Sequence, residues 1–468
     1  MAAQPDMLVD PDLAQRVLAR ALRRGGDFAE VFAEDRRATS AVLDDGRVEE
    51  LASGRDRGAG IRVVVGETTG FAHTADLSEA GLLAAAEAAA SVARDGETRT
   101  VAFGDRKGVA VSGALRPGDS VPKADKIALL ARADDAARSA GSAVAQVSAS
   151  YGDSRRRFLV ANSDGVLAVD DQVRSRLAVS VVAVGDTGRQ TGFESVAATS
   201  GFELFDRTDV AELAVAAARR ALGKLVARPA PSGAVPVVLA SGSGGILFHE
   251  ACGHGLEADH VAKDTSVYAG RVGELVASPL VTLVDDGTVG GEWGAFAVDD
   301  EGHPAGRTVL IERGVLVDYM WDGVRARKER RSSSGNGRRQ SYRHLPMVRM
   351  TNTFLLDGAD DPDGIVSRTP HGVYVAKLGG GQVNTATGDF VFGTTEAYLI
   401  EDGHLTEPLR DANLIGNGPE VLSRIDAVAG DFAMTPGTCG KDGQSVPVGC
   451  GQPTLRISSV TIGGTAGA

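Results

Sequence analysis

Two histidines five residues apart place the strictest local constraint on how this chain folds. Residues 248–255 read FHEACGHG, with imidazoles at His249 and His254. On a regular α-helix the two rings would point about 140° apart. Imidazole is a common zinc ligand, so two histidines that share one metal need a wider turn. We expect a helix widened as in a π-bulge, which Gly253 and Gly255 permit.

Glu250 follows the first histidine directly. The familiar zinc-peptidase pattern H-E-x-x-H places its histidines at i and i+4 on one helical face. A neighbouring glutamate that is not a ligand can act as general base on a zinc-bound water. The alternative is a helical histidine that merely satisfies its hydrogen bonds in a core or on a surface. The spacing alone leaves both interpretations open.

Composition excludes several classes of protein. The chain has 468 residues, a net charge of −13 and 43% hydrophobic residues, as expected of a globular protein of two or three domains. The acidic balance argues against nucleic acid as a partner. We find neither a signal-peptide core at the N-terminus nor a run of about 18 apolar residues that could span a membrane. Three cysteines without a secretory signal favour the cytoplasm.

Residues 1–228 are expected to form an N-terminal α/β domain with helices packed on an antiparallel sheet, so the fold class is α+β. Asp45-Gly46 and residues 163–165 are turn signals between strands, and Arg228-Pro229 opens the best domain boundary. The expected helices cover residues 11–24, 77–93, 123–140 and 206–226. The expected strands cover residues 28–33, 40–51, 60–66, 69–74, 143–151, 157–162 and 167–184.

Residues 229–468 are expected to form a β-rich domain that carries the histidine helix. A strand at 236–241 precedes this helix, and later strands alternate with glycine turns. Two similar segments, 310–316 and 399–405, are predicted hairpins. Residues 329–343 are polar and basic, so they form either a mobile surface loop or a lid over a substrate.

A catalytic zinc site usually has three protein ligands and one open position, so a third ligand is needed. Cys252 lies within the motif, but its side chain would diverge from the histidines on a helix. Cys450 lies in an apolar run typical of a small buried residue. Cys439 lies in a Gly/Pro-rich turn where a thiol can ionise. The candidates are Glu257, Asp259, His260 and Cys439.

Four ordered blocks of the sequence resemble the TldD/PmbA family of metallopeptidases. They are residues 249–254, 349–353, 416–418 and 439–455. The resemblance covers nearly the whole chain and is densest from 240 to 465. It implies an N-terminal α/β domain, a β-rich C-terminal domain and cleavage of unstructured peptides, including leader segments. It also implies a cytoplasmic heterodimer with a metal-free TldE/PmbA-type subunit; self-association is the alternative.

By position, the resemblance assigns His249, His254 and Cys439 as ligands of one Zn²⁺ and Glu250 as the general base. The motifs are intact, so the chain resembles the catalytic, TldD-type subunit. One departure is Cys450, where the family pattern leads us to expect an aliphatic residue. Cys450 could compete for the metal.

A compact polar block is a candidate for substrate binding: His344, Arg349, Thr351 and Asn352. The alternative is a strand with ordinary turn contacts. Tyr342 and His344 are possible oxyanion stabilisers, and an exposed strand edge could take an extended peptide.

Two other functions are considered. In one, the chain is a non-catalytic scaffold subunit whose metal is structural or absent. In the other, Cys252 and Cys439 form a thiol redox pair, although the chain has no C-x-x-C motif.

Overall fold

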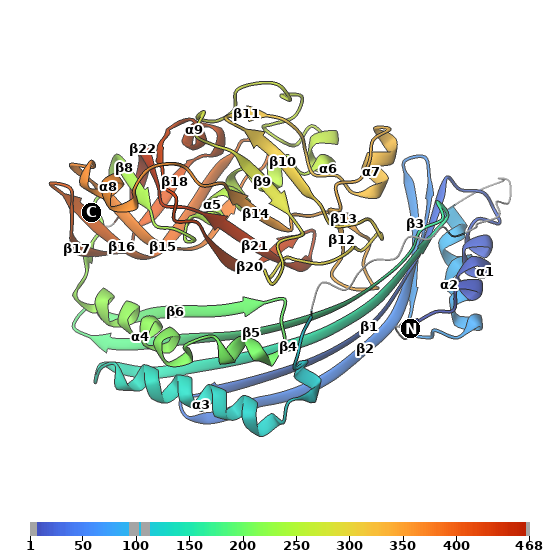
Figure 1. The fold of residues 1–468 in the computed structure, drawn as a ribbon, viewed down its shortest axis with the longest axis horizontal. Coiled ribbons are helices and arrows are strands. Elements are labelled where there is room, and N and C mark those ends of the chain that lie inside the picture. The colour runs from blue at the N-terminus through green and yellow to red at the C-terminus, as the bar shows by residue number, and fades with distance from the viewer. Residues whose placement is uncertain (1–6, 93–102, 104–112, 465–468) are drawn as a thin grey trace.

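The N-terminal part is one six-stranded antiparallel sheet, covered by helices on one face (Figure 1). The computed structural model describes residues 7–92, 103 and 113–464. The strand order is β3-β2-β1-β4-β5-β6. The strands are β1 (Phe28–Asp44), β2 (Arg47–Val65), β3 (Thr68–Thr74), β4 (Val144–Asn162), β5 (Leu167–Gly185) and β6 (Gly188–Ala198).

The predicted gaps within two of these strands are wrong. Residues 28–33 and 40–44 belong to the single strand β1, and residues 144–151 and 157–162 to β4. The hydrophobic pattern that predicts a strand is interrupted in both cases, because the strand centres carry charged residues. In the structure these charges face the C-terminal part, where Arg156 donates to Glu34 and Asp300 at 2.5 and 2.7 Å.

Alternation along the strands separates the two faces of this sheet. Odd-numbered residues of β1, such as Val31 and Ala41, pack under helices. Even-numbered residues, such as Phe32, face the C-terminal part, where Phe32 packs with Val298 and Tyr342. The predicted arrangement of helices on an antiparallel sheet is confirmed.

Two pairs of helices cover the odd-numbered face, one at each end of the sheet (Figure 1). The pairs are α1 (Pro11–Ala21) with α2 (Glu79–Ala89), and α3 (Lys123–Ser139) with α4 (Val210–Val226). Asp10 starts α1 because its carboxylate accepts from two N–H groups of the first turn. The predicted helix 77–93 is observed as α2 followed by a short 3-10 helix (Ala90–Val92), and position 93 lies outside the described residues. No helix in the described part is both long and apolar enough to cross a bilayer.

The C-terminal part contains a six-stranded sheet of order β11-β10-β9-β14-β21-β20. The predicted hairpin at 310–316 is confirmed as β10 and β11, and its turn residues Arg313 and Gly314 have φ of 48° and 85°. The strands are β9 (Leu283–Asp286), β10 (Arg307–Glu312), β11 (Val315–Leu316), β14 (Asn352–Leu355), β20 (Ala433–Lys441) and β21 (Gln444–Gln452).

A second C-terminal sheet closes on itself, because β16 pairs with both β15 and β18. The predicted hairpin at 399–405 joins β16 to β17 and is confirmed. The strands are β7 (Arg228–Pro229), β8 (Gly233–Leu239), β15 (His371–Val383), β16 (Asp389–Glu401), β17 (His404–Arg410), β18 (Asn413–Asn417), β19 (Ile425–Val428) and β22 (Leu455–Gly463).

The C-terminal part also contains several shorter elements. A two-stranded ladder joins β12 (Gly337–Arg338) and β13 (Met347–Val348). The short helices are α5 (Gly245–Phe248), α6 (Ala258–Ala262), α7 (Gly323–Lys328), α8 (Pro362–Ser367) and α9 (Gly418–Ser423).

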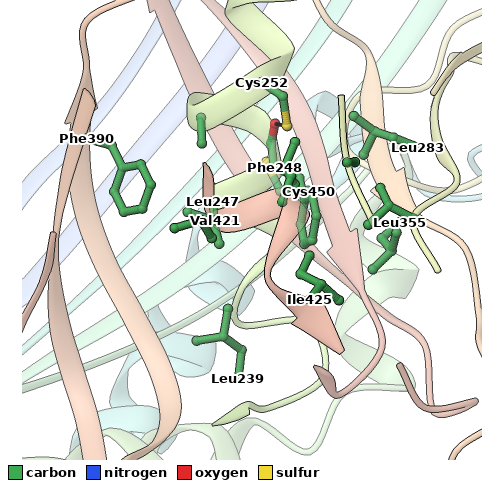
Figure 2. Close-up of a cluster of buried hydrophobic side chains, with 14 of the residues drawn as sticks. Leu239, Leu247, Phe248, Cys252, Leu283, Leu355, Phe390, Val421, Ile425 and Cys450 are labelled. Carbon is green, nitrogen blue, oxygen red and sulfur yellow. Dashed lines mark hydrogen bonds between the residues drawn. The ribbon is translucent and has the colours of Figure 1, made fainter. Parts of the chain in front are cut away.

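The histidine-bearing helical segment is held in the apolar core of the C-terminal part. Figure 2 shows Leu247 and Phe248 of this segment among side chains from both sheets. Leu239 and Phe390 come from the closed sheet, and Leu283, Leu355 and Cys450 come from the other. This packing fixes where the two imidazoles can point.

The basic segment 329–343 is not a surface loop along its whole length. Its second half is mostly buried between the N-terminal and C-terminal parts, and Arg339 is 1% exposed. Arg339 pairs there with Glu30, and the Tyr342 N–H donates to Glu34 at 3.0 Å. The interpretation of this half as a mobile surface loop is wrong, because Arg339 is a buried counter-charge of Glu30 inside the molecule.

Candidate metal centre

The helical segment widens at the predicted place. A π-helical turn spans His249–Gly253, and the N–H of His254 donates to the carbonyl of His249, five residues back. The ring centroids of His249 and His254 lie 5.1 Å apart, with an angle of 84° between their planes. The expectation of a widened helix that brings the two imidazoles together is confirmed.

Glycines make room for this turn. A Cβ at Gly253 would lie 2.1 Å from Met350 Sδ, and one at Gly418 would lie 2.2 Å from the carbonyl oxygen of Ala251. No side chain fits at either distance. Gly418 belongs to the 416–418 block, so this part of the motif lets α9 approach the π-helical turn closely.

Cys439 reaches the same point from the edge strand β20. Its Sγ lies 3.4 Å from His254 Nε2. The ligand atoms of His249, His254 and Cys439 all lie within 4.8 Å of one another, and all three residues are buried. Nitrogen and sulfur ligands at about 2.0–2.3 Å from a tetrahedral zinc would lie about 3.5 Å apart. The spacing therefore fits a single zinc ion.

His249 supplies a second sign that the three-residue group can bind a cation. Both of its ring nitrogens are buried, and neither has a hydrogen-bond partner among the described residues. A buried polar atom without a partner costs about 1–3 kcal/mol. A metal at the three-residue group would satisfy one of these nitrogens.

The electrostatics of the group favour a thiolate at Cys439. Burial opposes ionisation, but attraction by His249 and His254 outweighs it and lowers the pKa of the thiol to about 4. A thiolate, rather than a thiol, is the form that binds zinc.

Glu257, a candidate third ligand, lies on the other side of the His254 ring. Its Oε2 is 3.0 Å from His254 Nδ1, whereas Cys439 faces Nε2. Lys441 Nζ contacts Glu257 at 2.9 Å and Asp259 at 2.7 Å. Burial opposes the charge of Glu257, but Lys441 and His254 outweigh it and lower its pKa to about 2. Glu257 thus holds the imidazole in place, as carboxylates behind metal-binding histidines do.

Asp259 and His260, the other nearby candidates, form a separate group with Glu257. The ammonium group of Lys441 already bonds to both carboxylates of this group. The structure therefore does not bring Asp259 or His260 to the pair of imidazoles.

Glu250 lies beside the three-residue group. Its Oε2 is 3.9 Å from His254 Nε2, the ring nitrogen that faces Cys439. Its side chain is 22% exposed, more than that of His254 at 9%. A carboxylate in this position can exchange protons with a water molecule at the site.

The two other cysteines lie outside the group. Cys252 turns away, donates to the carbonyl of Phe248 at 3.0 Å and has its pKa raised to about 12 by burial (Figure 2). Cys450 is a small buried residue of β21, as expected, but it also lies beside His249: burial lowers the pKa of that histidine, and Cys450 and Cys439 outweigh burial and raise it. The redox interpretation gains no support, because Cys252 is a buried, un-ionised thiol.

The predicted substrate-binding block is inside the molecule. Arg349 donates to the carbonyl of Cys439 at 2.6 Å, and Thr351 donates to Asp285 at 2.7 Å. Asn352 accepts from the Gly294 N–H at 3.0 Å. These contacts hold β20 and β9 in place. Contact between these residues and a substrate stays a prediction.

The remaining predicted residues lie farther out. His344 is half-buried and contacts Ser341 at 2.9 Å, and the Tyr342 hydroxyl donates to Asp56 at 3.2 Å.

Asp285 is the residue that sequence reasoning missed. It is buried and accepts from Asn336, the backbone and hydroxyl of Thr351, and Thr353, at 2.7–2.9 Å. The sequence showed Asp285 only as the residue before a turn. The available signal was the pair Thr351 and Thr353, whose hydroxyls lie on one face of a strand.

Family models match the chain in three successive blocks. They describe PmbA/TldA metallopeptidase domain 1 at residues 29–93, the central domain at 116–225 and the C-terminal domain at 232–464.

Curated relatives match along almost the whole chain. The metalloprotease TldD homolog of Haemophilus influenzae is 42% identical over 94% of each chain. The zinc metalloprotease TldD homolog of Saccharolobus solfataricus is 26% identical over 96% of this chain and 99% of the relative.

Among solved structures, TldE from Thermococcus kodakarensis has the same fold, with a TM-score of 0.76 and 20% identity over 96% of this chain and 99% of that one. The domain models and the whole-length relatives lead to one conclusion: the chain belongs to the PmbA/TldD family of metallopeptidases.

Proposed function

We propose that the chain is a zinc-dependent peptidase in which His249, His254 and Cys439 hold one Zn²⁺. The observation that carries this proposal is the buried three-residue group, within 4.8 Å, with Glu250 beside it. Two imidazoles and a thiolate are a donor set that zinc prefers. Several relatives carry the name metalloprotease, and one the name zinc metalloprotease.

The chemistry follows from the residues. A zinc ion, when bound, supplies Lewis-acid polarisation and lowers the pKa of water towards about 7. Glu250 accepts a proton from the attacking water and passes it to the leaving amine. Glu257 and Lys441 keep the His254 ring oriented meanwhile. The negative charge of Cys439 makes the site less electrophilic than one with three histidines, so we expect a modest hydrolase.

The proposed substrate is an unstructured peptide, including leader segments, bound in extended form. Strand β20, which carries Cys439, lies at the edge of the six-stranded C-terminal sheet. Backbone groups along the outer side of an edge strand can pair with an added strand. A peptide bound there would pass close to the metal centre with its backbone held in register.

The proposed assembly is a cytoplasmic heterodimer in which this chain is the active subunit beside a TldE/PmbA-type subunit. It rests on the family and on the fold shared with TldE. A non-catalytic scaffold subunit is the second candidate. It explains less, because a scaffold has no need of the unsatisfied His249 next to a thiolate.

Glu250→Gln tests the mechanism. We expect this variant to keep its zinc and to lose at least about a hundredfold in cleavage of an unstructured peptide, with or without a TldE-type partner. Glu274→Gln is the matched control, since Glu274 is exposed and pairs with Arg271 at the surface. Cleavage at the parental rate by zinc-loaded Glu250→Gln would refute the proposed role.

A further inference from the structure

A cavity of about 300 Å³ lies between the even-numbered face of the N-terminal sheet and the hairpin formed by β20 and β21. The charged residues that line this cavity are mostly positive. Five are arginines and one is a carboxylate: Arg36, Arg156, Arg174, Arg338, Arg339 and Asp300. The metal centre does not use this cavity.

Strand register explains why these arginines converge. Arg36 of β1 is paired with Arg156 of β4, and Ser154 of β4 is paired with Arg174 of β5. Residues paired across strands point to the same face, and residues two apart share that face. The three arginines therefore lie in neighbouring rows on the face that meets the C-terminal part.

Two of the five arginines have carboxylate partners close by. Arg156 pairs with Glu34 and Asp300, and Arg339 pairs with Glu30. These pairs neutralise Arg156 and Arg339.

The other three arginines have no carboxylate in hydrogen-bond contact within the described part of the chain. Arg174 donates to the carbonyls of Trp293 and Ala295 and to the side-chain oxygen of Gln172. Arg338 donates to the carbonyls of Met350 and Pro447. These oxygens are all neutral.

Their burial makes the surplus charge costly. Arg174 and Arg338 are 6% and 4% exposed. Burial, together with repulsion from Arg338 and Arg156, lowers the pKa of Arg174 to about 9. Arg36 is half-buried and donates no hydrogen bond to any residue in the described part of the chain. Neutral oxygens compensate a buried charge less well than an opposite charge does, so an anion in the cavity would stabilise these guanidinium groups.

We propose that this cavity is an anion site that binds a carboxylate of a peptide, either an acidic side chain or the chain end. The inference rests on the proposed peptidase function. Guanidinium groups match the two oxygens of a carboxylate in a planar, bidentate geometry. The cavity has room for one such group together with its side chain.

The cavity and the metal centre lie on opposite faces of β20. Thr438 lines the cavity, whereas the next residue, Cys439, faces His254. A peptide added along the outer edge of β20 would also alternate its side chains between these faces. When one peptide residue lies on the side of the metal centre, its neighbour points towards the arginines. The site would thus select a peptide that carries a carboxylate on the residue next to the one held at the metal centre.

The test is a binding measurement on the full-length, zinc-loaded chain bearing Glu250→Gln, so that cleavage does not interfere. Three fluorescent, unstructured peptides are compared at fixed ionic strength. One is neutral with blocked ends, one has a single Glu in place of Gln, and one has a free terminal carboxylate. Arg36→Gln and Arg174→Gln remove one charge each. Arg176→Gln is the control, because Arg176 is exposed on the same strand as Arg174.

We expect at least one carboxylate-bearing peptide to bind about tenfold or more tightly than the neutral one. Arg36→Gln and Arg174→Gln should abolish this preference, and Arg176→Gln should keep it. Which peptide shows the preference identifies the source of the carboxylate. Arg36→Gln removes no hydrogen bond among the described residues, so it remains informative if Arg174→Gln unfolds.

Equal binding of all three peptides would overturn the proposal. So would a preference that survives in Arg36→Gln, or one that Arg176→Gln abolishes equally. Zinc content, and cleavage of the neutral peptide by the parent chain that retains Glu250, report separately on the proposed peptidase, so the two proposals fail independently.

Discussion

At the scale of single residues, the orientation of His254 depends on a chain of three side chains. Glu257 contacts the Nδ1 of His254, and Lys441 contacts Glu257. We predict that Glu257→Gln weakens zinc binding about 10- to 100-fold, because the imidazole loses its charged partner. Competition with a chromophoric chelator measures this affinity.

Asp259→Asn is the matched control, since Asp259 contacts Lys441 but makes no hydrogen bond to His254 among the described residues. Its effect on zinc affinity should be clearly smaller. Equal affinities for Glu257→Gln and the parent chain would show that Glu257 does not position the ligand.

Gly253 illustrates a residue whose lack of a side chain decides local geometry. A methyl group there would lie 2.1 Å from Met350 Sδ. We predict that Gly253→Ala lowers the free energy of unfolding by about 1–3 kcal/mol, because Met350 and the π-helical turn must move apart. Urea denaturation of the metal-free chain measures this difference.

Gly223→Ala is the control substitution. Gly223 lies in α4, and nothing lies within 4 Å of the place where its Cβ would be. This change should leave stability equal or raise it by up to about 1 kcal/mol. A loss in Gly223→Ala as large as that in Gly253→Ala would contradict the packing argument.

At the scale of elements, the sequence predicted the widened helix well and the long strands poorly. Spacing alone forces His249 and His254 onto different sides of a regular helix, so a wide turn follows from one simple geometric condition. The middles of β1 and β4 carry Glu34 and Arg156, which look like loop residues. Their partners are far away in sequence, so only the folded chain shows them inside a strand.

Glu203 joins the short helix Phe202–Asp206 to the segment before α3. Its carboxylate accepts from the N–H groups of Leu115, Arg116 and Gly201 at 2.9–3.1 Å. Burial opposes its charge, but backbone N–H groups, its own among them, outweigh this and lower its pKa to about 2. A lowered pKa in the folded state means that the stabilisation is present above about pH 4.5 and is lost as the pH falls towards 2.

We therefore predict that Glu203→Gln costs about 1–2 kcal/mol at pH 6, after allowance for its partial exposure. The difference from the parent chain should shrink as the pH falls to 3. Urea unfolding at several pH values measures it, with the exposed Glu212→Gln as control. A difference that stays constant with pH would contradict the assigned cause.

At the scale of the whole molecule, buried ion pairs hold the N-terminal sheet against the C-terminal part. Glu30 pairs with Arg62 and Arg339, and Arg62 also pairs with Glu301. We predict that Glu30→Gln lowers the free energy of unfolding by about 3–5 kcal/mol, because two buried arginines lose a partner. Glu79→Gln, at an exposed pair with Arg16, should cost less than about 1 kcal/mol.

Denaturant unfolding of both variants decides this prediction. Equal small losses would show that the interface depends on apolar packing rather than on charge. The pairs Arg62–Glu301 and Glu30–Arg339 join residues more than 200 positions apart, so no local pattern could reveal them. The same distance explains why residues 329–343 resembled a surface loop in sequence. The domain boundary at 228 stays a prediction.

The central claim is that His249, His254 and Cys439 hold one zinc ion. Mass spectrometry of metal content tests it most directly, on the parent chain, His254→Ala, Cys439→Ala and the control Cys450→Val. We predict about one zinc per chain in the parent and in Cys450→Val, and none in the other two. Zinc retained in Cys439→Ala, or absent from the zinc-supplied parent chain, would contradict the account.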